Sequence, residues 1–219
     1  MLNPVQIEAI IKGTGYTIII ALVAVLIGIV FGMLVAIGRI SKNKLMNRLT
    51  WIYVWFFRGT PLLLQLFMIF YAMPLIMKDV FGRPFPMNPL MACFIAFSLN
   101  STAYLAEFFR AGIESIDKGQ MEAAKALGMS YNQAMFQIII PQSFKRLLPS
   151  VGNEFIMLIK DTSLASTVAI SDLLRTTKTM SSSSGKWIYY VYAAVIYLVL
   201  TSIIQLGFEK IEKKVGVYE

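Results

Sequence analysis

Two acidic side chains interrupt an otherwise apolar stretch of the sequence, residues 147–171. They are Glu154 and Asp161, seven residues apart. On a helix this spacing is about two turns, roughly 10 Å along the axis, with both side chains within about 20° of one face. An ionised carboxylate at the centre of a bilayer costs about 2.5–3.5 kcal/mol on insertion scales. We therefore expect the pair to face a cavity or a partner, where it can contact the amino or guanidinium group of a cationic solute.

The depth of the two carboxylates agrees with a site inside a membrane. If the helix begins near Leu147, Glu154 lies about 10 Å deep and Asp161 about 21 Å deep, on either side of the midplane. Substrate sites of transporters tend to lie near the midplane. Asn100 and Tyr104, one turn apart on another apolar run, are expected to supply neutral hydrogen bonds to the same solute.

A structural role is the alternative for both carboxylates. Ion pairs with Lys160, Arg58 or Arg110 would lock neighbouring helices together. Lys160 lies about 100° around the helix from Asp161, so these two side chains need not face the same way. Glu107 and Arg110 are three residues apart and are expected to pair on one helix as structural support.

Other chemistry is excluded by composition. The 219 residues contain no histidine, and the one cysteine, Cys93, lies in an apolar run. The commonest general base and the commonest transition-metal ligand are therefore missing. An intramembrane enzyme would also need a nucleophile and a base side by side, and no such pair is evident. We expect no catalytic residue, no metal site, no cofactor and no enzymatic activity.

The composition is that of an integral membrane protein. Hydrophobic residues make up 57% of the chain and charged residues 15%, and the mean hydropathy is +0.67. Soluble domains have about 45–50% apolar and 25% charged residues. We predict an all-α membrane protein of one domain, residues 1–219, with five transmembrane helices. The predicted spans are residues 15–38, 55–77, 88–109, 147–171 and 187–208.

Two details of these spans carry further expectations. Pro74 should end or kink the second span near its far end, because proline lacks the N–H that a helix needs. Gly28 and Gly32 form a GxxxG motif in the first span, which suits close helix packing without saying which helix is the partner.

The basic residues indicate an orientation. The formal net charge is +8, and of the 20 Lys and Arg residues 13 lie in one set of inter-span segments and six in the other. Because cytoplasmic loops are enriched in Lys and Arg, this bias predicts an N-terminus outside and a C-terminus inside. The basic residues alternate with apolar spans, so anionic lipid is the expected partner of this charge and nucleic acid is not.

The longest polar segment, residues 110–146, is predicted to form two short helices on the cytoplasmic side. Asp117 and Ser130 are each followed three residues later by glutamine, which is typical of helix starts. Gly128 lies between them, where a left-handed residue would end the first helix, and Pro141 is expected to end the second. A helix-turn-helix can also bind DNA, but this one is attached to membrane spans on both sides.

This segment resembles the EAA loop of bacterial ABC importer permeases. The matching positions are Glu122-Ala123-Ala124, Gly128 and Ile138-Ile139-Ile140-Pro141, with the same spacing. Further matches place the sequence near the polar amino acid subfamily, whose permeases serve histidine, arginine, glutamine, glutamate or cystine. They are Arg58-Gly59-Thr60-Pro61 with Gln65, Ala103 through Arg110, and Lys160-Asp161-Thr162-Ser163-Leu164.

The resemblance implies a subunit that couples ATP hydrolysis elsewhere to transport. In this family the EAA loop inserts a short helix into a groove on a cytoplasmic ATPase. The residues implied in coupling are Glu122, Ala123, Ala124, Gly128, Ile138, Ile140 and Pro141. The solute of the carboxylate pair would then be an amino acid. The rival interpretation, an independent channel or ion-coupled carrier, gives no reason for an EAA loop.

The expected partners follow from the same resemblance. ATP would be bound by two ABC ATPase subunits, since Gly185-Lys186 lacks the glycine spacing and the Ser/Thr of a phosphate loop. A second permease copy or a paralogue would complete the pathway as a dimer. An extracellular or periplasmic binding protein would deliver the amino acid. The expected location is the bacterial cytoplasmic membrane, as a multi-pass protein surrounded by lipid.

Overall fold

The computed structural model describes residues 2–83 and 85–216, and within these ranges the chain is helical with no strand. Three of the segments have a wider or tighter winding than an α-helix: η1 and η2 are π-helical and η3 is a 3-10 helix. The elements are α1 (Pro4–Arg39), α2 (Lys44–Gly59), α3 (Leu62–Phe67), η1 (Met68–Ala72), α4 (Met73–Phe81), α5 (Pro89–Glu114), α6 (Lys118–Ala126), α7 (Tyr131–Ala134), η2 (Met135–Ile139), α8 (Ile140–Asp161), η3 (Thr162–Val168), α9 (Leu173–Ser184) and α10 (Ile188–Val215).

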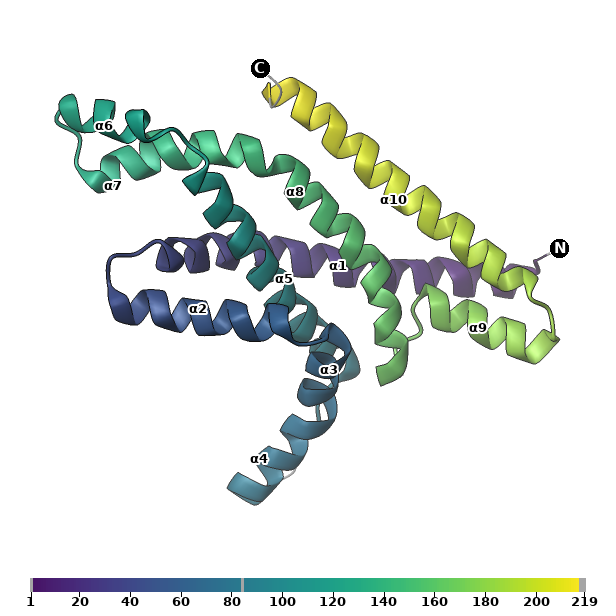
Figure 1. Cartoon of the computed structure of the whole chain (residues 1–219). Helices are drawn as coiled ribbons and strands as arrows, with labels where there is room; N and C mark the ends of the chain where they lie inside the picture. Colours follow the sequence, from purple (N-terminus) through teal and green to yellow (C-terminus); the bar gives the residue numbers. More distant parts are fainter. Residues whose placement is uncertain (1, 84, 217–219) are drawn as a thin grey trace.

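The bundle is built around α1, which packs along α5 and also contacts α2, α8 and α9 (Figure 1). α8 packs between α5 and α10, and α9 joins α1 to α10. The arm formed by α3 and α4 projects from the bundle, while α6 and α7 lie at one end of the molecule and the N-terminus at the other.

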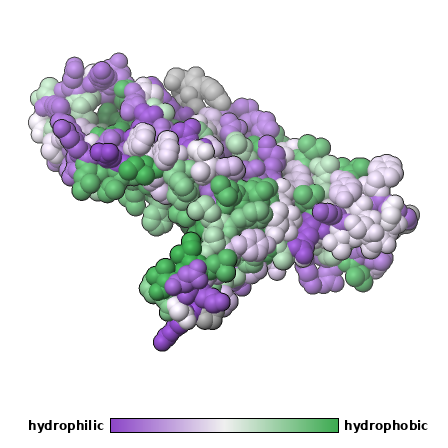
Figure 2. Space-filling view, turned by 60° about the horizontal axis from the view of Figure 1, so that its bottom comes forward, coloured by the Kyte–Doolittle hydropathy of each residue, from purple (hydrophilic) through white to green (hydrophobic). Residues whose placement is uncertain are grey.

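Within the described residues, four helical runs are long and apolar enough to cross a membrane. They are Pro4–Arg39, Leu62–Phe81, Pro89–Glu114 and Ile188–Val215. The predicted span 147–171 corresponds to α8 and η3, which is not among these four runs. In Figure 2 hydrophobic residues cover the middle of the visible face and the base of the projecting arm, and hydrophilic residues gather at the tip of the arm and at the end that carries α6 and α7.

The second predicted span, residues 55–77, was predicted to start too early, because the helix breaks inside it. α2 ends at Gly59, and Thr60 is extended, with φ −117° and ψ 146°. Pro61 explains the break, since the ring of a proline pushes the preceding residue out of the helical region. The run that is long and apolar enough to cross a membrane therefore begins at Leu62, and α2 is a separate helix folded back along α1.

Two prolines are accommodated by π-helical turns. Pro74 follows η1 and Pro141 follows η2, each two residues after the π segment ends. In a regular helix their rings would collide with the carbonyl groups of Phe70 and Gln137. These carbonyls lie in the π turns, where the hydrogen bonds span five residues and the backbone is wider. The prediction that Pro141 ends a helix was therefore wrong: the helix continues from Tyr131 to Asp161. At Pro74, where a stop or kink was predicted, the helix also continues and is only widened locally.

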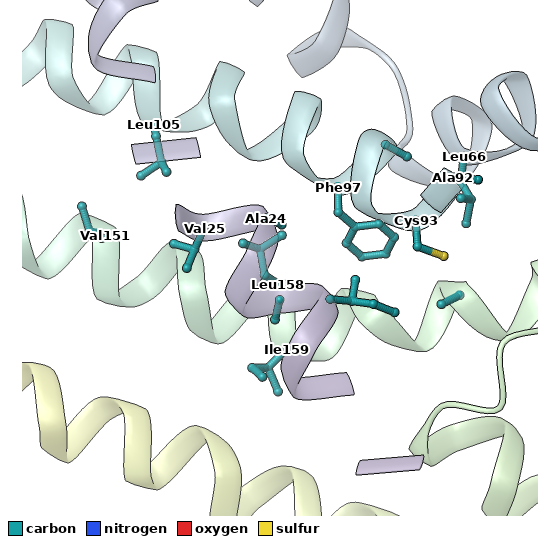
Figure 3. Packing of buried hydrophobic residues seen from close by; sticks show 14 of the residues in the cluster. Ala24, Val25, Leu66, Ala92, Cys93, Phe97, Leu105, Val151, Leu158 and Ile159 are labelled. Carbon is teal, nitrogen blue, oxygen red and sulfur yellow. The ribbon is translucent and has the colours of Figure 1, made fainter. Parts of the chain in front are cut away.

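The GxxxG motif of α1 packs against α5. A Cβ atom on Gly28 would lie 2.7 Å from the Ser101 Oγ, and one on Gly32 would lie 3.0 Å from the Leu105 Cβ. Only glycine allows this approach of the two helices. The apolar core continues from this contact across α5 to α8, with Phe97 and Leu158 fully buried in it (Figure 3).

The hook between α5 and α8 forms as its capping residues predict. The hook is residues 115–139, comprising α6, α7 and η2. The Asp117 side chain accepts a hydrogen bond from the Gly119 N–H at the start of α6. Ser130 and Gln133 form a reciprocal capping box at the start of α7. Gly128 has a φ of +83°, the left-handed conformation that reverses the chain between the two helices.

Candidate functional site

A cavity of about 320 Å³ lies where the α2–α3 break meets α5 and α8. All four residues predicted to contact substrate line it: Asn100 and Tyr104 from α5, and Glu154 and Asp161 from α8. The complete lining is Thr60, Pro61, Leu62, Leu63, Asn100, Tyr104, Glu154, Met157, Leu158, Asp161 and Leu164. The structure thus brings these residues together around one space large enough for a small solute.

The two carboxylates of the cavity are not neutralised by an ion pair within the part of the chain that the structure describes. Glu154 is only 4% exposed, and Asp161 is half-buried. Among the described residues no ion pair involves either of them. The Ser101 hydroxyl lies beside Glu154 but has no hydrogen bond of good geometry. Lys160, a partner in the structural alternative, is exposed and pairs with neither carboxylate.

Gln65 connects the helix break to the wall of the cavity. Its Nε2 donates to the Phe57 and Thr60 carbonyl oxygens at 2.9 and 3.0 Å. Its Oε1 accepts from the Asn100 Nδ2 at 3.0 Å. Two carbonyl groups at the end of α2, those of Phe57 and Thr60, are satisfied in this way. The sequence contained Gln65 within a matching segment, but its structural role depends on contacts that the sequence does not reveal.

Asn100 and Tyr104 each already interact with other residues of the chain. Asn100 Nδ2 also donates to the Phe57 carbonyl oxygen at 3.2 Å, so its amide oxygen is the group left for a solute. The Tyr104 ring lies under the Arg58 guanidinium, 5.3 Å from centroid to carbon. This cation–π contact fixes the ring at the cavity edge.

A second group of charges lies on α5 and is fully compensated. Glu107 accepts from the Arg39 Nε at 3.1 Å and from the Arg110 Nη2 at 2.8 Å, and the Arg58 Nη1 lies 3.9 Å away. Arg110 also pairs with Glu114. The predicted Glu107–Arg110 pair is confirmed, and Arg39 and Arg58 are additional partners that fasten α1 and α2 to α5. Two of the cations considered for the cavity carboxylates, Arg58 and Arg110, are therefore engaged here.

A small apolar core joins the hook to the ends of α1 and α5 and to the start of α8. Its buried members are Ile113, Ile116, Met135 and Ile139, with Ile40, Met121, Ile138 and Ile140 packed against them. Ala124, on α6, is also buried, with 1% of its surface exposed. Of the residues implied in coupling, Ile138, Ile140 and Ala124 thus help to hold the hook together.

The outward face of the hook carries the remaining residues of the motif. Glu122, Ala123 and Gly128 are exposed, as is Pro141 at the start of α8. Leu127, beside the Gly128 turn, is 82% exposed. An apolar side chain this exposed at the tip of a polar hook is a feature that the motif match did not include.

Comparison with known proteins decides the family. Residues 24–217 match the family of binding-protein-dependent transport system inner membrane components. The chain is 38% identical over 211 residues to the Bacillus subtilis amino-acid permease protein YxeN, covering 94% of this chain and 92% of that protein. It is 39% identical to the Rickettsia felis glutamine transport system permease protein GlnP, covering 95% and 94%. The chain belongs to this family of transport permeases.

A solved structure agrees with the assignment. The crystal structure of an amino acid ABC transporter with histidines superimposes with a TM-score of 0.85 and 32% identity, covering 98% of this chain and 99% of that one. The protein is therefore an inner-membrane permease subunit of an amino-acid ABC transporter. Such subunits transport rather than catalyse, and in this family they pair with one another and work with an ATPase partner.

Proposed function

We propose that this permease imports cationic amino acids and that the cavity between α5 and α8 is their binding site. The observation that carries this proposal is the Glu154–Asp161 pair, two carboxylates in one cavity that form no ion pair with any described residue. Burying charge without a partner is costly, and a cationic substrate removes that cost each time it binds. Asn100 and Tyr104 complete the site with neutral polar groups.

The relatives support the amino-acid part of the proposal. One of them is named for glutamine and the solved transporter for histidines. Glutamine is neutral, so the preference for a cationic side chain rests on the charges of this cavity.

We infer that the hook is the coupling element. Its outward residues Glu122 and Ala123, with the Gly128 turn and Leu127, would contact a groove of the ATPase. Ala124, Ile138 and Ile140 would keep the hook rigid from within, and Pro141 would join it to α8. Because α8 carries both Glu154 and Asp161, a movement of the hook would reach the cavity through one continuous helix.

The proposed assembly has two permease chains, this one with a copy or a close paralogue, on two ATPase subunits, with an external binding protein that delivers the amino acid. ATP would be bound by the ATPase subunits and by no site of this chain. Each chain would span the membrane five times, N-terminus outside, with α8 and η3 as the fourth span. These two segments form one run of 29 residues from Ile140 to Val168, which is long enough to cross a bilayer.

An amino-acid panel on the assembled complex tests the substrate proposal. The permease is purified with its ATPase in lipid nanodiscs, and ATP hydrolysis is measured with L-arginine, L-lysine, L-glutamine and L-glutamate. We expect the cationic amino acids to stimulate hydrolysis most. Strongest stimulation by L-glutamine or L-glutamate would overturn the cationic assignment.

Glu122→Lys tests the coupling proposal. We expect the variant to insert and fold normally but to lose the link between ATP hydrolysis and uptake. The matched control is Glu114→Lys, which lies at the end of α5 and outside the motif. Uptake that remains coupled in the Glu122 variant would refute the role of the hook.

A reporter fusion tests the topology. A cytoplasm-active reporter fused after Glu219, a position outside the described residues, is expected to be active inside the cell. An external signal would contradict the proposed orientation.

A further inference from the structure

A second cavity, of about 350 Å³, lies between α1, α2 and α5 and shares Tyr104 with the proposed substrate cavity. Arg39, Arg58, Trp51 and Trp55 are among the residues that line it. The two tryptophans are exposed and stack on each other, with their ring centroids 6.0 Å apart. Guanidinium groups bind phosphate, and tryptophan is enriched where a protein meets the membrane surface. The residue types of this cavity therefore indicate the headgroup region of a bilayer.

The arginines at this cavity outnumber the carboxylates that pair with them. Among the described residues two carboxylates serve three guanidinium groups: Glu107 and Glu114 pair with Arg39, Arg58 and Arg110. The Arg110 Nη2 lies 2.8 Å from the Glu107 Oε2, whereas the Arg58 Nη1 lies 3.9 Å from the same oxygen. Arg58 is thus the least compensated of the three arginines. Its side chain is 42% exposed and is available to a further anion.

The two tryptophans and Arg58 belong to a longer stripe on α2. Successive members are separated by four, three, four and three residues, the spacing of side chains on one helix face: Lys44, Arg48, Trp51, Trp55 and Arg58. All five side chains are exposed. Within the described part of the chain no ion pair involves Lys44 or Arg48. One face of α2 thus presents three cations and two indole rings to its surroundings.

A second stripe of α2 is apolar and also exposed. Leu45, Leu49 and Ile52 are separated by four and three residues and lie on one face. Because α2 packs along α1, which is long and apolar enough to cross a membrane, this stripe is positioned to contact acyl chains (Figure 1). A phospholipid at the cavity can thus keep its acyl chains beside α2 while its phosphate reaches the arginines.

The cavity lies near the end of α1, at the level expected for headgroups. Arg39 is the last residue of α1, and a Cβ atom on Gly38 would lie 2.5 Å from the Thr50 Cγ2. Trp51, the next residue of α2, is therefore level with the end of α1. The turn between α1 and α2 lies at the end of the molecule that carries α6 and α7 (Figure 1), which is cytoplasmic in the proposed orientation. Basic pockets between membrane helices on that side bind anionic headgroups.

We propose that the cavity between α1, α2 and α5 binds the phosphate of an anionic phospholipid of the cytoplasmic leaflet, with Arg39 and Arg58 as its cationic contacts. Trp51 and Trp55 contact the glycerol region of the same lipid. A free phosphate would use the arginines alone and leave the apolar stripe of α2 without a role, so the lipid is favoured. The inference does not depend on which amino acid is transported, and it uses the proposed orientation only to assign the leaflet.

The test measures which lipid reaches the two tryptophans. The complex of permease and ATPase is reconstituted in vesicles of dioleoyl phosphatidylcholine, part of which is replaced by dibrominated phosphatidylglycerol or dibrominated phosphatidylcholine. Bromine quenches tryptophan fluorescence, and the quenching that disappears in the double variant Trp51→Phe, Trp55→Phe reports this cavity. We expect the anionic lipid to give half of this quenching at a mole fraction at least about tenfold lower than the neutral lipid. Equal mole fractions would overturn the site.

Variants of Arg58 make the test specific. Arg58→Gln removes one cation of the cavity, and we expect the preference for the anionic lipid to fall about fivefold. Arg58→Lys keeps the charge and should keep most of the preference. Lys145→Gln is the matched control, because Lys145 is exposed and lies outside the cavity. Copurification with the ATPase verifies the assembly of each variant. An equal fall in Arg58→Gln and Lys145→Gln would mean that the overall charge sets the preference, which contradicts the inference.

Other occupants of the cavity give different results. Glycerophosphoglycerol, the soluble headgroup without acyl chains, is added in excess, and we expect the quenching to persist. Relief of the quenching would show a site for free phosphate groups and overturn the lipid assignment. If neither brominated lipid quenches the two tryptophans, a second copy of the chain or another protein covers the cavity, and the inference is wrong.

Discussion

Two groups of carboxylates on neighbouring helices have opposite surroundings. Glu107 on α5 is 12% exposed and lies within 4 Å of three arginines, from α1, α2 and α5 itself. Glu154 on α8 is still more buried and forms no ion pair with any described residue. The comparison separates two uses of buried charge. The Glu107 carboxylate holds helices together through its ion pairs. The Glu154 carboxylate lines a cavity without an ion pair, so it is available to bind a ligand.

The largest effect on stability is expected at Glu107, the carboxylate that lies near three arginines. Glu107→Gln leaves Arg39 and Arg110 without their shared carboxylate, and we expect the complex to lose about 3 kcal/mol of stability, the lower end for breaking a buried ion pair. The thermal unfolding midpoint of the purified complex measures it. Glu114→Gln is the control: its side chain is 54% exposed, so less than about 1 kcal/mol is expected. Equal shifts for both variants would refute the role of Glu107.

A lysine introduced at position 157 would supply a cation to Glu154 and Asp161. Met157 lines the cavity between the two carboxylates, three residues after Glu154 and four before Asp161, which are the spacings of neighbours on a helix. Met157→Lys should therefore convert this site into a compensated one and reduce L-arginine binding at least about tenfold. Met157→Gln, of similar length without charge, should bind L-arginine normally. If the lysine variant binds as well as the control does, the carboxylates do not form the site.

Neutralising Glu154 should not destabilise the protein. In Glu154→Gln a buried, uncompensated charge disappears, so we expect a thermal midpoint at least as high as that of the unaltered complex in the absence of substrate. Glu107→Gln is the contrasting variant on the neighbouring helix. A lower midpoint in Glu154→Gln would show that this carboxylate has a structural partner.

The smallest effect is expected at Arg58. Its side chain is 42% exposed and its Nη1 lies 3.9 Å from Glu107, so Arg58→Gln should change stability by about 1 kcal/mol or less. Arg39→Gln is the comparison, because Arg39 is 16% exposed and lies 3.1 Å away. A larger loss at Arg58 than at Arg39 would show that distance and burial do not rank these pairs.

Local features of this structure followed from the sequence. The helical period placed Glu154 and Asp161 on one stripe, and both line the cavity. The capping signals at Asp117 and Ser130 and the left-handed Gly128 are present as expected. These features depend on residues within one or two turns of each other, so short-range rules suffice.

Features that depend on distant contacts were missed. Nothing in the sequence connected Arg39 or Arg58 to Glu107, because their meeting depends on how α1 and α2 pack against α5. The continuation of the helix through Pro141 depends on a change of hydrogen-bond register in η2. The break before Leu62 had a signal, the proline at 61, which the apolar run around it concealed.

The most direct test of the central claim uses the double variant Glu154→Gln, Asp161→Asn in the reconstituted complex. Stimulation of ATP hydrolysis is measured with L-arginine and with L-glutamine, in the variant and in the unaltered protein. Because L-arginine offers the two carboxylates a guanidinium group in addition to its α-ammonium group, we expect the response to L-arginine to fall at least about tenfold and the response to L-glutamine to fall less. Equal losses for both amino acids, or an unchanged response to L-arginine, would contradict the claim that this open pair of carboxylates recognises the substrate.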